Sequence, residues 1–297
     1  MGNIVSYKNG NYTVMLDLSN GSKMRFNNLD NLTPDHAESM DITISKYCEM
    51  GCPFCYAGCS KDGKHADIMS HSFIDNLPPY TELALNGNEP LHPDLVPFLN
   101  KCRKLKLIPS LTVNQHTFMK NTDMLKKLSD SKMIYGLGVS LTNPSDEFID
   151  VIKQFPNAVI HTIAGITELN EYMSLAHNGL KILVLGYKTV GRGKEWFDFD
   201  SDGITMRING FKSDVEKMID ENWFDVISFD NLALEQLEVK RLMSEDEWER
   251  TYMGDDGKFS LYVDMVSSKF YKNSMSTSGH DLTDDTVQMF DIIRNEG

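Results

Sequence analysis

Short apolar runs recur through the middle of the chain, and stretches with helical spacing or helix-capping residues lie between most of them. After the second run they return about every 25 residues, the length of one strand–helix unit. We therefore expect strands and helices to alternate. The apolar runs span residues 41–45, 82–85, 108–113, 134–140, 158–163 and 181–186. The helical stretches span residues 93–105, 121–128, 145–154 and 168–177.

This alternation predicts an α/β fold with a parallel sheet, because parallel neighbours need a crossover connection that is usually a helix. Six such strands fit a partial (β/α)6 TIM-like barrel over residues 40–193, with an open doubly wound sheet as the alternative. In both architectures, ligands bind at the carboxyl ends of the strands. The loop that follows residue 45 would lie at that end.

The segment before the barrel, residues 1–39, has the pattern of a β-hairpin appendage. Two alternating runs, 12–18 and 23–26, flank Asn20 and Gly21. This dipeptide tolerates the positive φ angles of a tight hairpin turn.

The segment after the barrel, residues 194–297, breaks the regular alternation, and no linker-like stretch precedes it. We expect an α+β extension packed on the barrel. Its helical stretches span residues 211–222, 232–243, 245–250 and 283–294, and its strand-like runs span 225–230 and 258–264.

The composition is that of a globular protein, with 41% apolar and 24% charged residues. No window approaches the ~18 apolar residues of a membrane span, and the amino terminus lacks the pattern of a signal peptide. We therefore expect a cytoplasmic protein without a membrane partner. The net charge of −14 argues against binding of polymeric nucleic acid, although a nucleotide substrate remains open.

Three of the five cysteines are clustered, at Cys48, Cys52 and Cys55. A disulfide framework would need dispersed pairs in a secreted chain, whereas clustered cysteines in a reducing compartment bind metal or do redox chemistry. Three thiolates on one loop can hold three corners of a four-iron cluster and leave the fourth iron open to a small molecule.

Two other metal sites are possible at this loop. Structural zinc could use Cys59, His65 or His71 together with the clustered cysteines. A closed electron-transfer cluster would take Cys59 as its fourth ligand. Cys102 lies in a helical stretch and is expected in the core.

The Cys48-x3-Cys52-x2-Cys55 motif after a first strand, with Phe54 before its third cysteine, resembles the signature of the radical S-adenosylmethionine (radical SAM) superfamily. The resemblance implies that the three cysteines hold a 4Fe–4S cluster. It also implies that the amino and carboxylate groups of S-adenosylmethionine chelate the fourth iron. The whole chain is also similar to phage and bacterial members that lack additional clusters.

A second stretch, Gly87-Asn88-Glu89-Pro90, resembles the Gly-Gly-Glu-Pro segment with which the family binds the amino group of the cofactor's methionine moiety. An ammonium group suits backbone carbonyls and a carboxylate, and glycine permits close approach. Asn88 departs from the family pattern. The alternative is a plain turn closed by Pro90.

Further cofactor contacts are expected at the ends of later strands. Asn114 and Ser140 could bind the ribose hydroxyls, and Tyr187 lies in a segment that could hold the adenine. Each could instead satisfy local hydrogen bonds at its strand end.

A basic loop, residues 187–194, stands out in this acidic chain. Lys188 and Arg192 could clamp a carboxylate or phosphate of the substrate or of the cofactor; a solvated loop is the alternative. Asp230, Gln236 and Tyr262 could line the far side of the same pocket.

The resemblance implies reductive cleavage of S-adenosylmethionine to a 5′-deoxyadenosyl radical, which abstracts hydrogen from the substrate. We expect a small-molecule or nucleotide-like substrate and a low-potential electron donor such as flavodoxin or ferredoxin. The alternatives are radical modification of a peptide or protein, as by activases of glycyl-radical enzymes, and a zinc or iron–sulfur binding module without radical chemistry.

Overall fold

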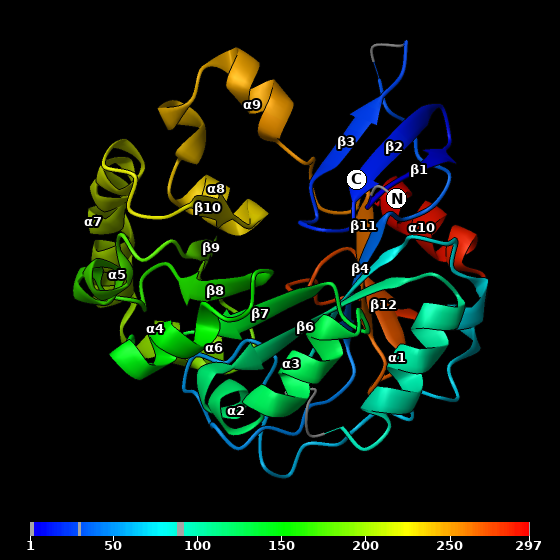
Figure 1. Ribbon diagram of the computed structural model, residues 1–297, viewed down its shortest axis with the longest axis horizontal. Coiled ribbons are helices and arrows are strands. Elements are labelled where there is room, and N and C mark those ends of the chain that lie inside the picture. The colour runs from blue at the N-terminus through cyan, green and yellow to red at the C-terminus, as the bar shows by residue number, and fades with distance from the viewer. Residues whose placement is uncertain (1–2, 29–30, 88–91, 297) are drawn as a thin grey trace.

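The computed structural model describes residues 3–28, 31–87 and 92–296, and its centre is a ten-stranded sheet (Figure 1). Seven parallel strands form most of this sheet: β4 (Ser39–Thr43), β5 (Glu82–Asn86), β6 (Ile108–Asn114), β7 (Gly136–Ser140), β8 (Ala158–Ile163), β9 (Lys181–Leu185) and β10 (Val226–Phe229). The other three strands are β11 (Ser260–Asp264), β12 (Lys269–Tyr271) and β13 (His280–Asp281).

The strand order is β10-β9-β8-β7-β6-β5-β4-β11-β12-β13. The six predicted strands of the core are confirmed, as is their parallel pairing. From β4 to β10 the described strands follow one another in chain order, without the reversal that defines a doubly wound sheet. Within the described residues the sheet does not close into a ring, because β10 and β13 form its two edges.

One face of the parallel strands is covered by helices (Figure 1). Apolar side chains on this face, such as Leu111, Val139 and Ile182, are buried against Phe98, Phe148 and other helical residues. The helices that contribute to this core are α1 (Leu95–Lys104), α2 (Gln115–Lys120), α3 (Thr122–Asp130), α4 (Asp146–Ile152), α5 (Leu169–Leu175) and α7 (Ser201–Asp220). Helix α6 (Arg192–Phe199) lies between β9 and α7 in the chain.

Helices α2 and α6 were not predicted. Helix α2 follows β6 without a loop, so no turn residues mark its start in the sequence. Asn114 caps α2, because its side chain accepts a hydrogen bond from Thr117 N (2.8 Å). Helix α6 begins at Arg192, between two glycines that are typical of a loop. The basic loop is therefore shorter than expected.

The amino-terminal segment forms a separate three-stranded antiparallel sheet, β1 (Ile4–Asn9), β2 (Tyr12–Asp17) and β3 (Lys23–Phe26). The predicted β2–β3 hairpin is confirmed, and β1 is an additional strand. Glu38, which immediately precedes β4, ties this sheet to the main one: its carboxylate accepts hydrogen bonds from Arg25 Nε (2.8 Å) and Tyr12 OH (2.6 Å).

The carboxy-terminal segment extends the main sheet at both ends instead of packing on it from outside. Strand β10 pairs with β9, and β11 pairs in parallel with β4. The segment also contains α8 (Asn231–Gln236), the 3-10 helix η3 (Val239–Leu242), α9 (Glu245–Thr251) and α10 (Thr286–Asn295). Earlier in the chain, η1 (Ser72–Asn76) lies between β4 and β5. Within the described parts of the chain, no helix has the length and apolar character needed to cross a lipid bilayer.

Candidate functional site

The face of the parallel sheet opposite its helices lines a cavity of about 680 Å³. Successive strand side chains point to opposite faces, so alternate residues of β5 to β9 face this cavity while their neighbours form the core. The volume lies within the ~300–1,000 Å³ that is common for small-molecule sites. The strand residues in its lining are Asp41, Ala84, Asn86, Ser110, Leu111, Thr112, Asn114, Gly136, Leu137, Gly138, Ser140, Val159, His161, Ile163, Leu183, Leu185 and Tyr262.

Small side chains give the cavity its depth. Asp41 pairs with Ala84, Ala84 with Ser110, and Ser110 with Gly136, so one row across the sheet has little side-chain volume beyond Asp41. In the next row, a Cβ atom at Gly138 would lie 2.3 Å from His161 Cε1. Glycine at 138 therefore makes room for the imidazole ring on the cavity side of the sheet.

The cysteine loop follows β4 and lies at the carboxyl end of the strands. Bridges between Ser45 and His65 and between Tyr47 and Ser60 close its base. The Cys48 N–H donates to Ser60 O at 2.9 Å. The loop is thereby held on both sides of the motif by its own backbone.

All three motif cysteines, Cys48, Cys52 and Cys55, are half-buried and line the cavity together. Cys59 is buried, and its thiol hydrogen-bonds to Cys55. That hydrogen bond, against the opposing effect of burial, and the nearby charge of Arg192 lower the pKa of Cys55. Burial instead raises the pKa of Cys52. A lowered pKa favours the thiolate, which is the form that binds metal.

The segment after β9 clamps the cysteine loop. Arg192 donates from Nε to Cys52 O (3.0 Å) and from Nη2 to Cys59 O (2.8 Å). A Cβ atom at Gly191 would lie 2.2 Å from Tyr56 O, so only glycine permits this approach. Arg192, expected from the sequence to bind an anion, therefore contacts loop carbonyls and is not among the residues that line the cavity.

Among the residues that the structure describes, no three His, Cys, Asp or Glu side chains are gathered so that they could hold one metal ion. Structural zinc needs four donors around one point. A four-iron cluster differs, because each cysteine binds a separate iron. Three half-buried thiols that open into one cavity are a suitable donor set for such a cluster.

The other predicted site residues fall in three groups. Phe54, Asn114, Ser140, Tyr187 and Lys188 all line the cavity. At Gly87 the φ angle is +112°, and a Cβ atom there would lie 1.9 Å from Ser45 O, so the β5 end packs tightly on the start of the cysteine loop. Asn88, Glu89 and Pro90 lie outside the described residues.

Of the three residues expected on the far side, Asp230 and Tyr262 line the cavity, whereas Gln236 binds the backbone of Tyr187 through both amide atoms (2.8 and 3.0 Å). The sequence prediction missed Asp41 and Tyr56. The sequence did contain a signal for Asp41: it is a charged residue between the apolar Met40 and Ile42 of a strand, so its side chain points to the opposite face of the sheet.

The cavity lining also carries charged side chains. Lys188 Nζ donates to Ser274 Oγ (2.9 Å) and lies 4.3 Å from the centre of the Tyr56 ring. Asp230 caps α8 and accepts hydrogen bonds from Gly186 N and Ala233 N, both at 2.8 Å. Burial, assisted by the charge of Lys188, lowers the pKa of His161 to about 4, so its ring is neutral at physiological pH.

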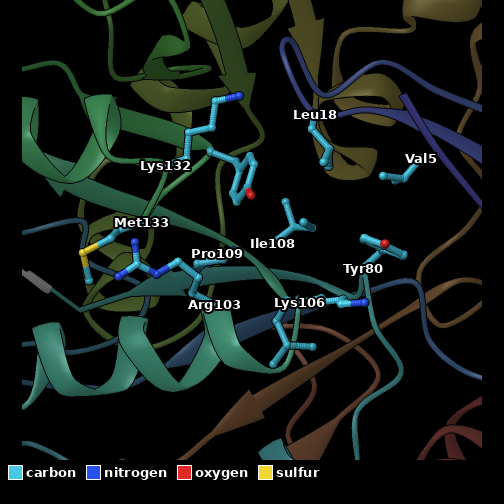
Figure 2. A pocket seen from close by; sticks show the side chains of 11 residues that line it. Val5, Leu18, Tyr80, Arg103, Lys106, Ile108, Pro109, Lys132 and Met133 are labelled. Carbon is cyan, nitrogen blue, oxygen red and sulfur yellow. The ribbon is translucent and has the colours of Figure 1, made fainter. Parts of the chain in front are cut away.

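Two other cavities lie away from the cysteine loop. Figure 2 shows one of about 210 Å³, where Ile108 and Pro109 from the start of β6 meet Arg103, Lys106 and Lys132. Parallel sheets bind ligands at the opposite, carboxyl ends of their strands. The other, of about 440 Å³, lies in the carboxy-terminal segment beside Trp248 and Tyr252. The large cavity with the cysteines is therefore the candidate active site.

No protein-family model matches the chain, and no curated protein matches it in sequence. Among solved structures it is similar to the crystal structure of Streptococcus suis SuiB, with a TM-score of 0.61 and 12% identity over 99% of this chain and 87% of that chain. A match to M. tuberculosis tryptophan synthase in its aminoacrylate-bound form has a TM-score of 0.32 and 7% identity, over 70% of this chain and 87% of that chain. The similarity to SuiB supports the α/β fold alone.

Proposed function

We propose that the chain is a radical S-adenosylmethionine enzyme that works in the large cavity, on a sheet curved into a partial (β/α)6 barrel. One observation carries the proposal: three thiols of a single loop open into a cavity of about 680 Å³ at the carboxyl ends of parallel strands. The site combines a donor set for an iron–sulfur cluster with space for a cofactor and a substrate.

Cys48, Cys52 and Cys55 would hold the 4Fe–4S cluster. When bound, the reduced cluster and S-adenosylmethionine would together supply a hydrogen-abstracting carbon radical by cleavage of the sulfonium. Cys59 and Arg192 would act on the loop rather than on the cofactor. Cys59 donates its hydrogen bond to Cys55, and Arg192 fixes the carbonyls of Cys52 and Cys59.

The cavity lining offers suitable contacts for the cofactor. Asn114 and Ser140 could bind hydroxyl groups, and the aromatic rings of Phe54 and Tyr187 could pack on the cofactor's apolar surfaces. Gly87 would bring the β5 end close to the cysteine loop, and Asn88, Glu89 and Pro90 follow it in the sequence.

The lining would also protect a reactive species. Ile163, Leu183 and Leu185 present apolar side chains to the cavity, and apolar walls exclude the water that would compete for a radical. Lys188 remains the proposed substrate contact, since Arg192 is engaged with the loop. We propose a small-molecule or nucleotide-like substrate, a cytoplasmic location and a flavodoxin or ferredoxin as electron donor.

Anaerobic reconstitution tests this function. Protein treated with iron and sulfide, then with dithionite and S-adenosylmethionine, should release 5′-deoxyadenosine. Cys55→Ala should lose the cluster absorbance and the product. Cys102→Ala, a matched change of a buried helical cysteine, should keep both.

Cys59→Ala separates an open site from a closed one. The variant should retain the cluster, because Cys59 is a hydrogen-bond donor and not a ligand in this proposal. Equal iron loss in Cys59→Ala and Cys55→Ala would favour a closed four-cysteine site. Stoichiometric zinc in the purified protein, or no 5′-deoxyadenosine from a protein loaded with iron and sulfide, would contradict the enzyme proposal.

A further inference from the structure

The charges of the large cavity are unbalanced. Among the described residues of its lining, Asp41, Asp230 and Lys188 carry charge at neutral pH apart from the motif thiols. Two carboxylates thus face one ammonium group. His161, which is neutral, adds no positive charge to the cavity lining.

Neither carboxylate is neutralised by a direct partner in the described part of the chain. Lys188 directs its ammonium group to Ser274 and to the Tyr56 ring. Asp230 uses Oδ1 to accept from Ala233 N in its helix cap and from Gly186 N after β9, which leaves Oδ2 without a partner among the described residues. Asp41 accepts no hydrogen bond from the described residues.

Electrostatics agree with the contact pattern. Asp41 is open to the cavity yet surrounded by protein, and burial raises its pKa although the charge of Lys188 opposes the shift. Burial raises the pKa of Asp230 in the same way, again against Lys188. Both carboxylates would gain from a further positive charge nearby.

On one side of Asp41 the sheet carries only small side chains. Its neighbours across the sheet in one direction are Ala84, Ser110 and Gly136. On the other side Tyr262 pairs with Asp41, and its hydroxyl is already hydrogen-bonded to Thr43 Oγ1 (2.7 Å). A ligand can therefore reach the carboxylate over the small residues.

We propose that Asp41 and Asp230 form a substrate subsite for a cationic nitrogen group, an amine or a guanidine. This inference rests on the proposed function, since it names the substrate class of the same cavity. Lys188 then acts as a positioning residue: its charge favours the ionised form of both carboxyls. The cationic group could belong to a free small molecule or to the side chain of a peptide.

Matched probes test the charge requirement. Butylguanidine and its neutral isostere butylurea represent the free molecule; blocked Gly-Arg-Gly and Gly-citrulline-Gly peptides represent the side chain. Binding is measured by calorimetry or ligand-observed NMR on as-purified and on reconstituted protein. We expect the guanidine of at least one pair to bind about tenfold or more tightly than its urea partner, the size of one charged hydrogen bond.

Two variants test the residues. Asp41→Asn and Asp230→Asn should each weaken guanidine binding about tenfold and leave urea binding unchanged. Asparagine at 230 keeps the helix cap, because its side-chain oxygen can accept the same two hydrogen bonds. Asp285→Asn is the control: Asp285 caps α10 in the same manner, accepting from Gln288 N at 2.9 Å. It should bind the probes as the wild type does.

Three results would overturn the subsite: no preference for guanidine over urea, equal affinity in the Asp41 and Asp230 variants, or displacement of the guanidine by S-adenosylmethionine. The last would assign the carboxylates to the cofactor. Preference for the peptide or for butylguanidine identifies the source of the group. Probe binding to the as-purified protein does not require the cluster. A failure of the subsite proposal can therefore be distinguished from a failure to form 5′-deoxyadenosine, which tests the proposed function.

Discussion

At the scale of single residues, the cavity is defined by where side chains are small and where charge is left uncompensated. Gly136, Gly138 and Ala84 remove volume from the floor, and Asp41 projects over it. The Asp41 carboxylate is exposed to the cavity and accepts no hydrogen bond from the described residues. It contributes no such contact to the fold, which leaves it available to a ligand.

Asp41→Asn is expected to stabilise the fold slightly at pH 7, by about 0.5 kcal/mol or less, because the carboxylate is exposed to the cavity and solvent screens its charge. The folded-state pKa of Asp41 is raised by burial, and the charges of Asp230 and Asp256 act in the same direction while Lys188 opposes them. The penalty is therefore absent below the unfolded pKa of about 3.9, grows as the pH rises through the folded pKa and is constant above it.

Urea unfolding of both proteins between pH 3 and pH 8 checks this expectation. The difference in unfolding free energy should shrink toward zero at the acid end. A variant that is less stable than the wild type at pH 7 would mean that the Asp41 carboxylate makes a favourable interaction in the free protein.

At the scale of elements, the cysteine loop and the start of α6 form one unit. The loop has few apolar contacts of its own, and Arg192 links two of its carbonyls to a helix far along the chain. The cysteine motif could be found in the sequence because its spacing is local. It could not predict the role of Arg192, because the partners are backbone atoms more than a hundred residues away and the flanking glycines are typical of an open loop.

Arg192→Gln should loosen the cysteine loop, because the side chain can no longer reach both carbonyls. We expect faster amide exchange over residues 48–60 and lower iron content after reconstitution, with global stability reduced by about 1–3 kcal/mol. Lys194→Gln is the control: Lys194 forms an exposed ion pair with Asp198 on the solvent side of the same helix. If Arg192 instead clamps an anion, exchange and iron content would be normal and only ligand binding would weaken.

At the scale of the whole molecule, the main sheet is assembled from distant parts of the chain. The six central strands were predictable, because short apolar runs separated by helical stretches are local signals. The position of β11 beside β4 was not, because pairing between segments more than 200 residues apart leaves no local pattern. The carboxy-terminal segment is consequently part of the sheet that carries the cavity, and Tyr262 reaches the cavity from it.

Glu38 lies where the amino-terminal sheet meets the starts of β4, β5 and β11 in the main sheet. Its N–H donates to Phe259 O (2.8 Å), its carbonyl accepts from Glu82 N (2.9 Å), and its buried carboxylate binds Arg25 and Lys23. Burial alone would raise the pKa of this carboxyl, but the hydrogen bond from Arg25 and the two positive charges outweigh it and lower the pKa below its usual value.

Glu38→Gln should therefore destabilise the whole fold by about 3–5 kcal/mol, since it leaves the buried Arg25 without its carboxylate partner and Lys23 with Glu82 alone. The folded pKa is lowered, so the stabilisation is present above the unfolded pKa of about 4.3 and is lost as the pH falls through the folded pKa. Urea unfolding at pH 7 and in acid measures both effects. Glu245→Gln, which breaks an exposed pair with Lys240, should change stability by less than about 1 kcal/mol. Equal effects of the two variants would mean that the amino-terminal sheet does not help to hold β4 and the cysteine loop in place. The sheet would then be an independent appendage, as the sequence pattern alone predicts.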